Sequence, residues 1–216
     1  MAWAVTETGH YKLLSCPEVP KGSPPILSLS KDPRSFMSHA PLLLRPSSAD
    51  DVPALAAIYA WNVLNGTGTF ELDAPDTAEV ARRRDDVVSK GLPWLVAERC
   101  GAVLGFAYAN HFRPRKAYRF CLEDSIYLAR GAQGQGIGKL LLAELLAQCE
   151  ARGARQMLAV IGDSANAGSI GVHRALGFEQ TGIMRSAGWK FDRWLDVVVM
   201  QRALGLGDTT PPVDLA

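Results

Sequence analysis

Apolar and polar residues recur along this chain with two different periods, and each period predicts one kind of element. Short apolar runs are typical of strands and are found at Leu42–Arg45, Trp94–Glu98, Val103–Asn110, Tyr118–Leu128, Gln156–Ile161 and Leu195–Gln201. Longer segments with apolar residues at helical spacing are found at Val52–Leu64, Asp76–Lys90, Gly138–Arg152 and Ser169–Leu176. In the resulting order, β-α-α-β-β-β-α-β-α-β, hairpins precede an alternating β-α-β half. The pattern therefore predicts an α/β fold of mixed type, with a mixed sheet instead of an all-parallel one.

Capping and turn residues mark where several of these elements begin and end. The polar stretch Pro46–Asp51 supplies helix-start chemistry for the first helix, and Gly66–Phe70 is predicted as the loop that follows it. Asp76 favours the start of the second helix, and Gly91 favours its end. Arg99–Gly101, between two apolar runs, indicates a hairpin turn.

Both ends of the chain differ in composition from its centre. Residues 1–40 are rich in proline and small polar residues, lack a clear periodicity and are predicted to form a flexible N-terminal extension. This stretch contains more acidic residues than a typical transit peptide. Residues 41–204 carry the regular pattern and are predicted as one domain, and residues 205–216 as a loose C-terminal tail.

Composition and charge are those of an ordinary globular protein. Of the 216 residues, 48% are hydrophobic and 21% are charged, and a net charge of +1 does not call for nucleic acid or a membrane surface as partner. No apolar run approaches the roughly 20 residues that span a bilayer, and the N-terminus lacks a secretory signal. The four cysteines form no C-x-x-C pair, which argues against zinc and redox motifs and is compatible with reduced thiols. We therefore expect a soluble, cytoplasmic protein.

The segment from Arg130 to Lys139 carries the most informative chemistry in the sequence. It lies between a predicted strand and a predicted helix. Its glycines are Gly131, Gly134, Gly136 and Gly138. Glycines let a backbone approach an anion closely, and the start of the following helix offers unpaired N–H groups and the positive end of its dipole. The turn is therefore predicted to bind a phosphate or a pyrophosphate.

Two familiar phosphate-binding motifs do not fit this turn. A Walker-type loop requires G-x-x-x-x-G-K-[ST], but Gln133 stands at its first glycine and Leu140 follows Lys139. The dinucleotide fingerprint G-x-G-x-x-G would begin at Gly134 and place Lys139 at its last glycine. It would also lie after the hairpins, whereas the fingerprint belongs to a first βαβ unit. Both classes of nucleotide-binding protein are therefore disfavoured.

The pattern that does fit is Q-x-x-G-x-G, formed by Gln133, Gly136 and Gly138. It resembles the pyrophosphate-binding signature of the GNAT superfamily of N-acetyltransferases, and Asn166 and the Leu-Gly-Phe run Leu176–Phe178 strengthen the resemblance. The resemblance covers residues 42–202 and implies the GNAT acyl-CoA N-acyltransferase fold, a mixed, mostly antiparallel sheet flanked by helices. It also implies acetyl-CoA as co-substrate, no metal, and an N-acetyltransferase domain over residues 41–204.

Several segments narrow the resemblance to one subfamily, the phosphinothricin and methionine sulfoximine (sulfone) N-acetyltransferases. The similar segments, in the same order, are Trp94–Glu98, Ala107–Tyr108, Arg115–Tyr118, Glu123–Tyr127, Ala159–Gly162, His173–Phe178 and Gly188–Val197. This sequence departs from the subfamily pattern in one place, where the segment between Ile161 and His173 is one residue longer. The resemblance implies acetylation of the amino group of a small amino-acid-like substrate by a homodimeric enzyme.

Glu123 and His173 are the catalytic candidates. The strand period places one set of residues on a shared face: Arg119, Cys121, Glu123, Ser125 and Tyr127. A buried glutamate is costly unless it is paired or hydrated, so Glu123 is either a salt-bridged structural acid or, as we favour, a general base. In the resembling family this base acts through water on the substrate ammonium. His173 stands where many superfamily members place a tyrosine that protonates the thiolate, and the acid, base and structural interpretations of it stay open.

The resemblance also implies two binding surfaces. Contacts to the cofactor are expected from Ile126, Tyr127, Leu128, Gln133, Gly134, Gln135, Gly136, Ile137, Gly138, Lys139, Asn166 and Ser169. Contacts to the acceptor are expected from Phe70, Arg113, Arg115, Lys116, Ala117 and Tyr118. A guanidinium pairs well with a carboxylate or a phosphinate, although Arg113 and Arg115 are also compatible with solvated loop positions, and Phe70 with a core position. The Trp189–Trp194 region is expected to close the site or to join a dimer interface.

Two other functions remain open at this stage. An enzyme of the same fold could acetylate a protein N-terminus, an aminoglycoside or a polyamine, although a polyamine site would favour an acidic cleft and the Arg113–Arg115 loop argues against one. A non-catalytic acyl-CoA-binding regulatory module is the second alternative. Loss of the base or of the glycine turn would indicate such a module, and both features are present.

Overall fold

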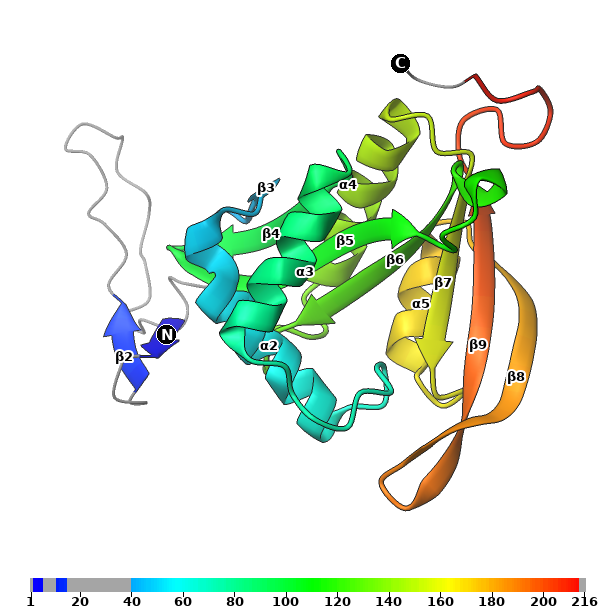
Figure 1. The fold of residues 1–216 in the computed structure, drawn as a ribbon. Helices are drawn as coiled ribbons and strands as arrows, with labels where there is room; N and C mark the ends of the chain where they lie inside the picture. Colours follow the sequence, from blue (N-terminus) through cyan, green and yellow to red (C-terminus); the bar gives the residue numbers. More distant parts are fainter. Residues whose placement is uncertain (1, 6–10, 15–39, 214–216) are drawn as a thin grey trace, which may run out of the picture.

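The structure is a computed structural model that describes residues 2–5, 11–14 and 40–213. A seven-stranded sheet forms its centre (Figure 1). The strands, in spatial order, are β3 (Leu43–Pro46), β4 (Trp94–Arg99), β5 (Ala102–His111), β6 (Cys121–Leu128), β7 (Gln156–Gly162), β9 (Arg193–Ala203) and β8 (Glu179–Lys190). All neighbouring strands are antiparallel except β6 and β7, which are parallel. The predicted mixed, mostly antiparallel sheet is confirmed.

Helices cover both faces of this sheet, so that two hydrophobic cores form. The helices are α2 (Val52–Asn65), α3 (Thr77–Ser89), α4 (Ile137–Ala151) and α5 (Ala167–Ala175), with short 3-10 turns η1 (Ala49–Asp51) and η2 (Lys116–Tyr118). In Figure 1, α2 and α3 lie on one face and α4 and α5 on the other. Along β4, Trp94 and Val96 pack toward α2 and α3, whereas Leu95 and Ala97 pack toward α4. Burial on both faces explains why β4 is apolar at consecutive positions.

Local capping chemistry sets the helix boundaries much as the sequence predicts. The Asp76 carboxylate accepts a hydrogen bond from the backbone N–H of Glu79 and so caps α3. Gly91 follows the helix with a positive φ of 72°, a conformation that costs glycine little. Gly136 directly precedes α4 and also has a positive φ, of 78°.

Two strand predictions differ from the structure. β8 was not predicted, because it is an edge strand with mostly exposed side chains and its sequence therefore has no apolar alternation. The strand predicted from Tyr118 begins at Cys121, since Lys116–Tyr118 forms the η2 turn. Arg119 terminates that turn and does not share a strand face with Cys121 and the residues that follow.

The ends of the chain are described in part. Within the predicted N-terminal extension, β1 (Ala2–Val5) pairs antiparallel with β2 (Tyr11–Leu14), and the rest of residues 1–39 lies outside the described residues. The start of the predicted C-terminal tail is held by Arg155, which donates hydrogen bonds to the carbonyl oxygens of Gly207 and Thr210. Residues 214–216 lie outside the described part as well.

The described cysteines include two free thiols and one disulfide-bonded residue. Cys121 and Cys149 are free thiols, as expected. Cys100 is disulfide-bonded, which corrects the expectation of reduced thiols at that position. Over residues 2–5, 11–14 and 40–213, every helix is too short or too polar to cross a membrane.

Candidate active site

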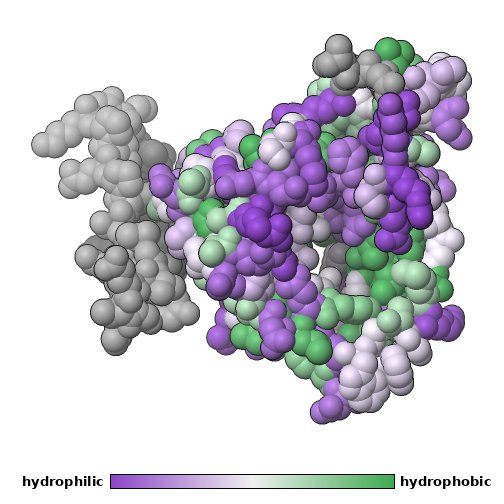
Figure 2. All heavy atoms as spheres, in the orientation of Figure 1, coloured by the Kyte–Doolittle hydropathy of each residue, from purple (hydrophilic) through white to green (hydrophobic). Residues whose placement is uncertain are grey.

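The site is created by two parallel strands that pair only over part of their length. β6 and β7 are in register from Cys121 to Asp124, where Asp124 lies opposite Ala159. Beyond that point, Ser125–Leu128 and Val160–Gly162 line a cavity of about 760 Å³ between the two strands. The surface is hollowed between the α2–α3 side and the β7–β9 side of the molecule (Figure 2).

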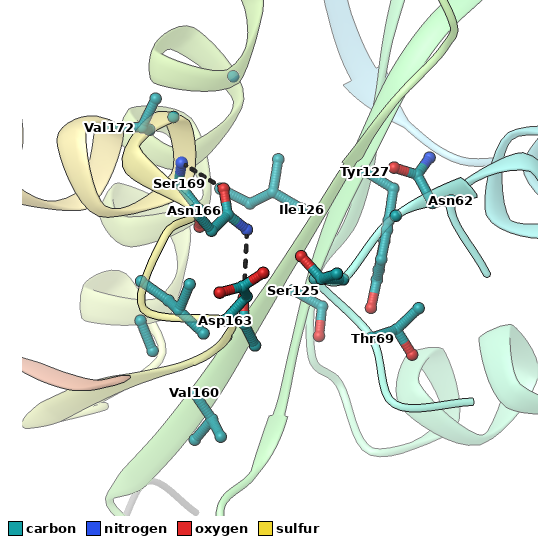
Figure 3. A pocket seen from close by; sticks show the side chains of 18 of the residues that line it. Asn62, Thr69, Ser125, Ile126, Tyr127, Val160, Asp163, Asn166, Ser169 and Val172 are labelled. Atoms are coloured by element: carbon teal, nitrogen blue, oxygen red, sulfur yellow. Dashed lines mark hydrogen bonds between the residues drawn. The ribbon is translucent and has the colours of Figure 1, made fainter. Parts of the chain in front are cut away.

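Side chains from opposite sides of the split converge on this cavity. In Figure 3, Asn62, Thr69 and Tyr127 approach from one side, and Asn166 and Ser169 from the other. The predicted residues that the structure brings together in the lining are Phe70, Glu123, Ile126, Tyr127, Leu128, Gln133, Gly134, Gly138, Asn166, Ser169 and His173. Sequence segments more than a hundred residues apart therefore share one cavity.

The glycine-rich turn is organised by its own glutamine side chains. The Gln133 carboxamide oxygen accepts a hydrogen bond from the N–H of Gly131, at 2.9 Å. The Gln135 carboxamide nitrogen donates to the Gly131 carbonyl oxygen, also at 2.9 Å. A Cβ added at Gly134 or Gly136 would meet no atom within 4 Å, so their positive φ angles, and not crowding, favour glycine here. The turn thus holds the start of α4, with its unpaired N–H groups, at the edge of the cavity.

Four predicted cofactor residues belong to this turn without lining the cavity. They are Gln135, Gly136, Ile137 and Lys139. Ile137 packs its side chain into the core beneath α4, so only its backbone can face a ligand. Gln135, Gly136 and Lys139 are exposed.

A second helix start faces the glycine turn across the cavity. Asn166 caps α5 by accepting a hydrogen bond from the N–H of Ser169 at 3.1 Å, and its amide nitrogen donates to the Gly162 carbonyl oxygen at 3.4 Å (Figure 3). The cap links the end of β7 to α5 and fixes Asn166 and Ser169 beside the cavity.

Glu123 is half-buried on β6, next to the point where the strands separate. Burial is the main influence on its carboxyl group and raises its pKa, with a further increase from the adjacent Asp124. Arg113 opposes this effect and lowers the pKa of Glu123, but the net shift is upward. A carboxylate with a raised pKa is a better base than an exposed one.

An aromatic wall lies on the Glu123 side of the cavity. Tyr59 and Tyr127 meet edge to face at 4.7 Å between ring centroids, and Tyr108 lines the cavity beside them. Burial raises the pKa of Tyr108 to about 12, against a lowering by its hydrogen bond with Ser125. These tyrosines therefore stay neutral hydrogen-bonding groups near neutral pH.

Phe70 lies in the loop after α2 and packs closely against Gly162 of β7 and Gly188 of β8. A Cβ at Gly188 would overlap the Phe70 ring, and a Cβ at Gly162 would overlap the Thr67 carbonyl oxygen and lie 3.0 Å from the ring. Lys190, which is 3% exposed, donates a hydrogen bond to the Thr69 carbonyl oxygen at 2.8 Å. The loop that carries Phe70 is thus pinned against β7 and the β8–β9 hairpin.

The stretch predicted to contact the acceptor lies outside the cavity lining. It comprises Arg113, Arg115, Lys116, Ala117 and Tyr118, which follow β5 and include the η2 turn. Its side chains are exposed, the Arg113 guanidinium lies 4.7 Å over the Phe112 ring, and Tyr118 meets that ring edge to face. Of this stretch, Arg113 is near enough to Glu123 to lower the pKa of its carboxyl group.

His173 is buried, and both of its ring nitrogens have partners. Nδ1 lies 2.7 Å from the carbonyl oxygen of Ser169, and Nε2 lies 3.0 Å from Oδ2 of Asp124. Burial, the largest single influence, lowers the pKa of His173, but the hydrogen bond and charge of Asp124 together with the Ser169 carbonyl outweigh it. The net result is a raised pKa.

Several residues of the lining were not predicted from the sequence. They include Asn62, Thr67, Gly68, Thr69, Tyr108, Asp124, Ser125, Val160, Asp163 and Val172. Tyr108 and Ser125 lie within segments that carry the family resemblance, and Asp124 directly follows Glu123, so the resemblance itself could have indicated them. In the part of the chain that the structure describes, there is no cluster of three or more His, Cys, Asp or Glu residues that could hold a metal ion.

Comparisons with known proteins found similar sequences and similar folds. The model of the acetyltransferase (GNAT) family matches residues 55–178. A phosphinothricin N-acetyltransferase from Alcaligenes faecalis is 55% identical over 163 residues, which make up 76% of this chain and 83% of that protein. An L-methionine sulfoximine/L-methionine sulfone acetyltransferase from Pseudomonas aeruginosa is 39% identical over 159 residues, 73% of this chain and 92% of that protein. The crystal structure of a GNAT superfamily phosphinothricin acetyltransferase from Sinorhizobium meliloti in complex with acetyl-CoA is similar with a TM-score of 0.78 and 49% identity, covering 80% of this chain and 94% of that chain.

Proposed function

Because this chain belongs to the GNAT acetyltransferase family and is an acetyl-CoA-dependent N-acetyltransferase, we propose that its acceptor is the amino group of a small amino-acid-like molecule. Phosphinothricin, methionine sulfoximine and methionine sulfone are the model acceptors of this type. The observation that carries the proposal is the position of Glu123, a half-buried carboxylate with a raised pKa in the same cavity as the glycine turn. Similarity to relatives named for these acceptors supports the choice of substrate class.

Acetyl-CoA is held, in this proposal, between the two helix starts that face the cavity. The N–H groups at the start of α4 and the glycine turn around Gln133 suit the pyrophosphate, because a helix N-terminus attracts anions. The cavity side of Ser125–Leu128 and Val160–Gly162 has no strand partner across the split, which suits the amide groups of the pantetheine arm. Asn166 and Ser169 supply the opposite side.

Glu123 acts as the general base, directly or through one water molecule. It takes a proton from the substrate ammonium, and the neutral amine then attacks the thioester carbonyl. The C–N bond forms as the C–S bond breaks, and the second proton of the amine leaves with the thiolate. We assign no proton transfer to His173, because both of its ring nitrogens are already hydrogen-bonded.

The acceptor lies on the aromatic side of the cavity, near Tyr108 and Phe70. Arg113 and Arg115 provide positive charge at the rim, which suits the carboxylate or phosphinate of an amino-acid-like molecule. Lys116 and Tyr118 lie in the same stretch and complete the rim. An acceptor without an anionic group, such as an aminoglycoside, would gain nothing from these cations.

The enzyme is proposed to act as a homodimer through the β8–β9 hairpin. This hairpin carries large exposed apolar side chains, namely Met184, Trp189, Phe191 and Trp194. Clustered apolar side chains of this size on a surface indicate a protein contact. Light scattering of the purified chain tests the dimer, and a monomer at micromolar concentration would contradict it. The cytoplasmic location stays a prediction.

A thiol-release assay with a panel of amines tests the acceptor and the base. We expect turnover with the three model acceptors and little with aminoglycosides or peptides. Glu123→Gln should lower kcat/KM by about 10²–10⁴-fold, the usual contribution of a general base, while acetyl-CoA still binds. The proposed acceptor class is wrong if only peptides or aminoglycosides are acetylated, and the base assignment is wrong if Glu123→Gln keeps full activity at neutral pH.

A further inference from the structure

The buried pair formed by Asp124 and His173 has no part in the reaction described above. Asp124 and Glu123 are consecutive on β6, so their side chains point to opposite faces of the strand. Asp124 points toward α5, where it meets His173, and the two residues are 6% and 4% exposed. A buried charged pair of this kind is unusual enough to require an explanation.

The hydrogen bonds of His173 restrict what its ring can do. A carbonyl oxygen only accepts, so Nδ1 must donate its proton to the Ser169 carbonyl. The proton between Nε2 and Asp124 is assigned to the imidazole, because the hydrogen bond and charge of Asp124 favour the imidazolium form of His173. The pair then has no net charge, and no ring nitrogen is available for a thiolate unless an existing hydrogen bond breaks.

The position of the pair suggests its purpose. Asp124 is the last residue of β6 that is in register with β7, so the pair lies where the split begins. Ser169, which binds Nδ1 of His173, also belongs to the cap of α5 and lines the cavity. One chain of hydrogen bonds therefore connects the residue beside Glu123 to the cofactor-facing start of α5.

We propose that Asp124 and His173 are positioning residues that fasten α5 to the apex of the split, and that His173 keeps its proton throughout the reaction. The pair fixes the distance between the acetyl-CoA side of the cavity and Glu123. The inference rests on the proposed function in that it takes Glu123 as the base and the α5 start as part of the acetyl-CoA site. His173 is then not the acid that protonates the thiolate.

The groups around the pair are few and can be named. Asp124 faces His173 from α5, has Glu123 beside it on β6, and influences Cys149 on α4, whose thiol pKa burial raises to about 12. His173 also meets Phe178 edge to face at 5.0 Å between ring centroids. None of these other groups is a cation that would favour the loss of a proton from His173.

Nuclear magnetic resonance of the histidine rings in the full, ¹⁵N-labelled chain tests the protonation state. His173→Gln identifies the resonances of His173 among the four histidines. We expect His173 to stay doubly protonated at neutral pH and above the pH at which an ordinary histidine loses its proton, which is near 6.5. In Asp124→Asn the amide can still bond the ring, but His173 should become singly protonated at neutral pH. Titration of His173 near 6.5 in the unaltered enzyme would overturn the proposal.

Kinetics separates positioning from proton transfer. Asp124→Asn should raise the KM for acetyl-CoA about tenfold, change kcat less than about threefold and leave the pH dependence of kcat unchanged. Asp51→Asn is the matched control, since Asp51 is also 6% exposed and hydrogen-bonded to a cation, Arg45, away from the cavity. An unchanged KM in Asp124→Asn, or a shift as large in the control, contradicts the proposal.

A double variant guards against general damage. His173→Gln leaves the Asp124 carboxylate buried without its cation, whereas His173→Gln combined with Asp124→Asn leaves two neutral amides. The double variant should therefore recover part of the acetyl-CoA affinity that His173→Gln loses. If His173 were the acid instead, kcat would fall by about a hundredfold or more in both variants, and the pH dependence of kcat would change as well. Full activity of Glu123→Gln would refute the base alone, because the His173 titration does not depend on that residue.

Discussion

Gly162, at the end of β7, is the position where a single methyl group should disturb the site most directly. Its α-carbon faces the loop that carries Phe70, and the Cβ of Gly162→Ala would overlap the carbonyl oxygen of Thr67. The neighbouring atom is backbone, so a side-chain rotation cannot relieve the overlap. The loop must move away from β7, and Phe70, 3.0 Å from the same Cβ, must move with it.

The size of the effect follows from these contacts. Overpacking of this kind costs about 1–3 kcal/mol, which corresponds to a fall in Tm of about 2–12 °C for a domain of this size. Displacement of Phe70 by about an ångström should raise the KM for the acceptor at least about tenfold, while the KM for acetyl-CoA changes less. The assays are differential scanning fluorimetry and steady-state kinetics with each substrate varied.

Gly182→Ala on β8 provides the control, because a Cβ there meets no atom within 4 Å and φ is not positive. Its Tm and both KM values should stay close to those of the unaltered enzyme. The reasoning is refuted if Gly162→Ala behaves like this control, since the loop would then not be packed against β7 in solution. A loss of acetyl-CoA affinity without a change at the acceptor would also refute it.

Two further predictions concern the base and the core. Burial raises the pKa of Glu123, and Arg113 partly offsets this, so kcat/KM should rise with pH through a midpoint above the pKa of an exposed glutamate. Arg113→Ala should move that midpoint to still higher pH. A midpoint that falls or stays in place in the pH–rate profile of Arg113→Ala would contradict this. Leu145 on α4 is fully buried in the larger core, so Leu145→Ala should lower the free energy of unfolding by about 2–5 kcal/mol in urea titrations. Leu140→Ala on the exposed side of the same helix should cost much less, and equal losses would place the core elsewhere.

The features that the sequence predicted well are those encoded locally. Asp76 and Gly91 bound α3 through contacts within a few residues, and the spacing of glycines around Gln133 reflects backbone angles that few other residues adopt. The apolar runs of β4 and β7 are equally direct, because consecutive residues of both strands are buried. Such signals do not depend on the rest of the fold.

The features that the sequence did not reveal depend on contacts between distant segments. The partner of Asp124 is 49 positions away, and only the parallel pairing of β6 and β7 brings α5 beside it. The close packing of Phe70 requires Gly162 and Gly188, which in sequence are ordinary glycines of two strands. β8 lies at the sheet edge with mostly exposed side chains, so its sequence lacks the apolar–polar alternation from which a strand can be predicted.

The split between β6 and β7 also couples the stability of the fold to binding of the acetyl donor. Where the two strands part, each keeps a row of backbone groups that would elsewhere hold a sheet together. If the pantetheine arm forms hydrogen bonds with these backbone groups, bound acetyl-CoA adds about 2.7 kcal/mol to the free energy of unfolding at a concentration of a hundred times its Kd. Without bound acetyl-CoA the chain lacks that added stability, so we expect it to open locally, and to be cut by a protease, more readily than the complex.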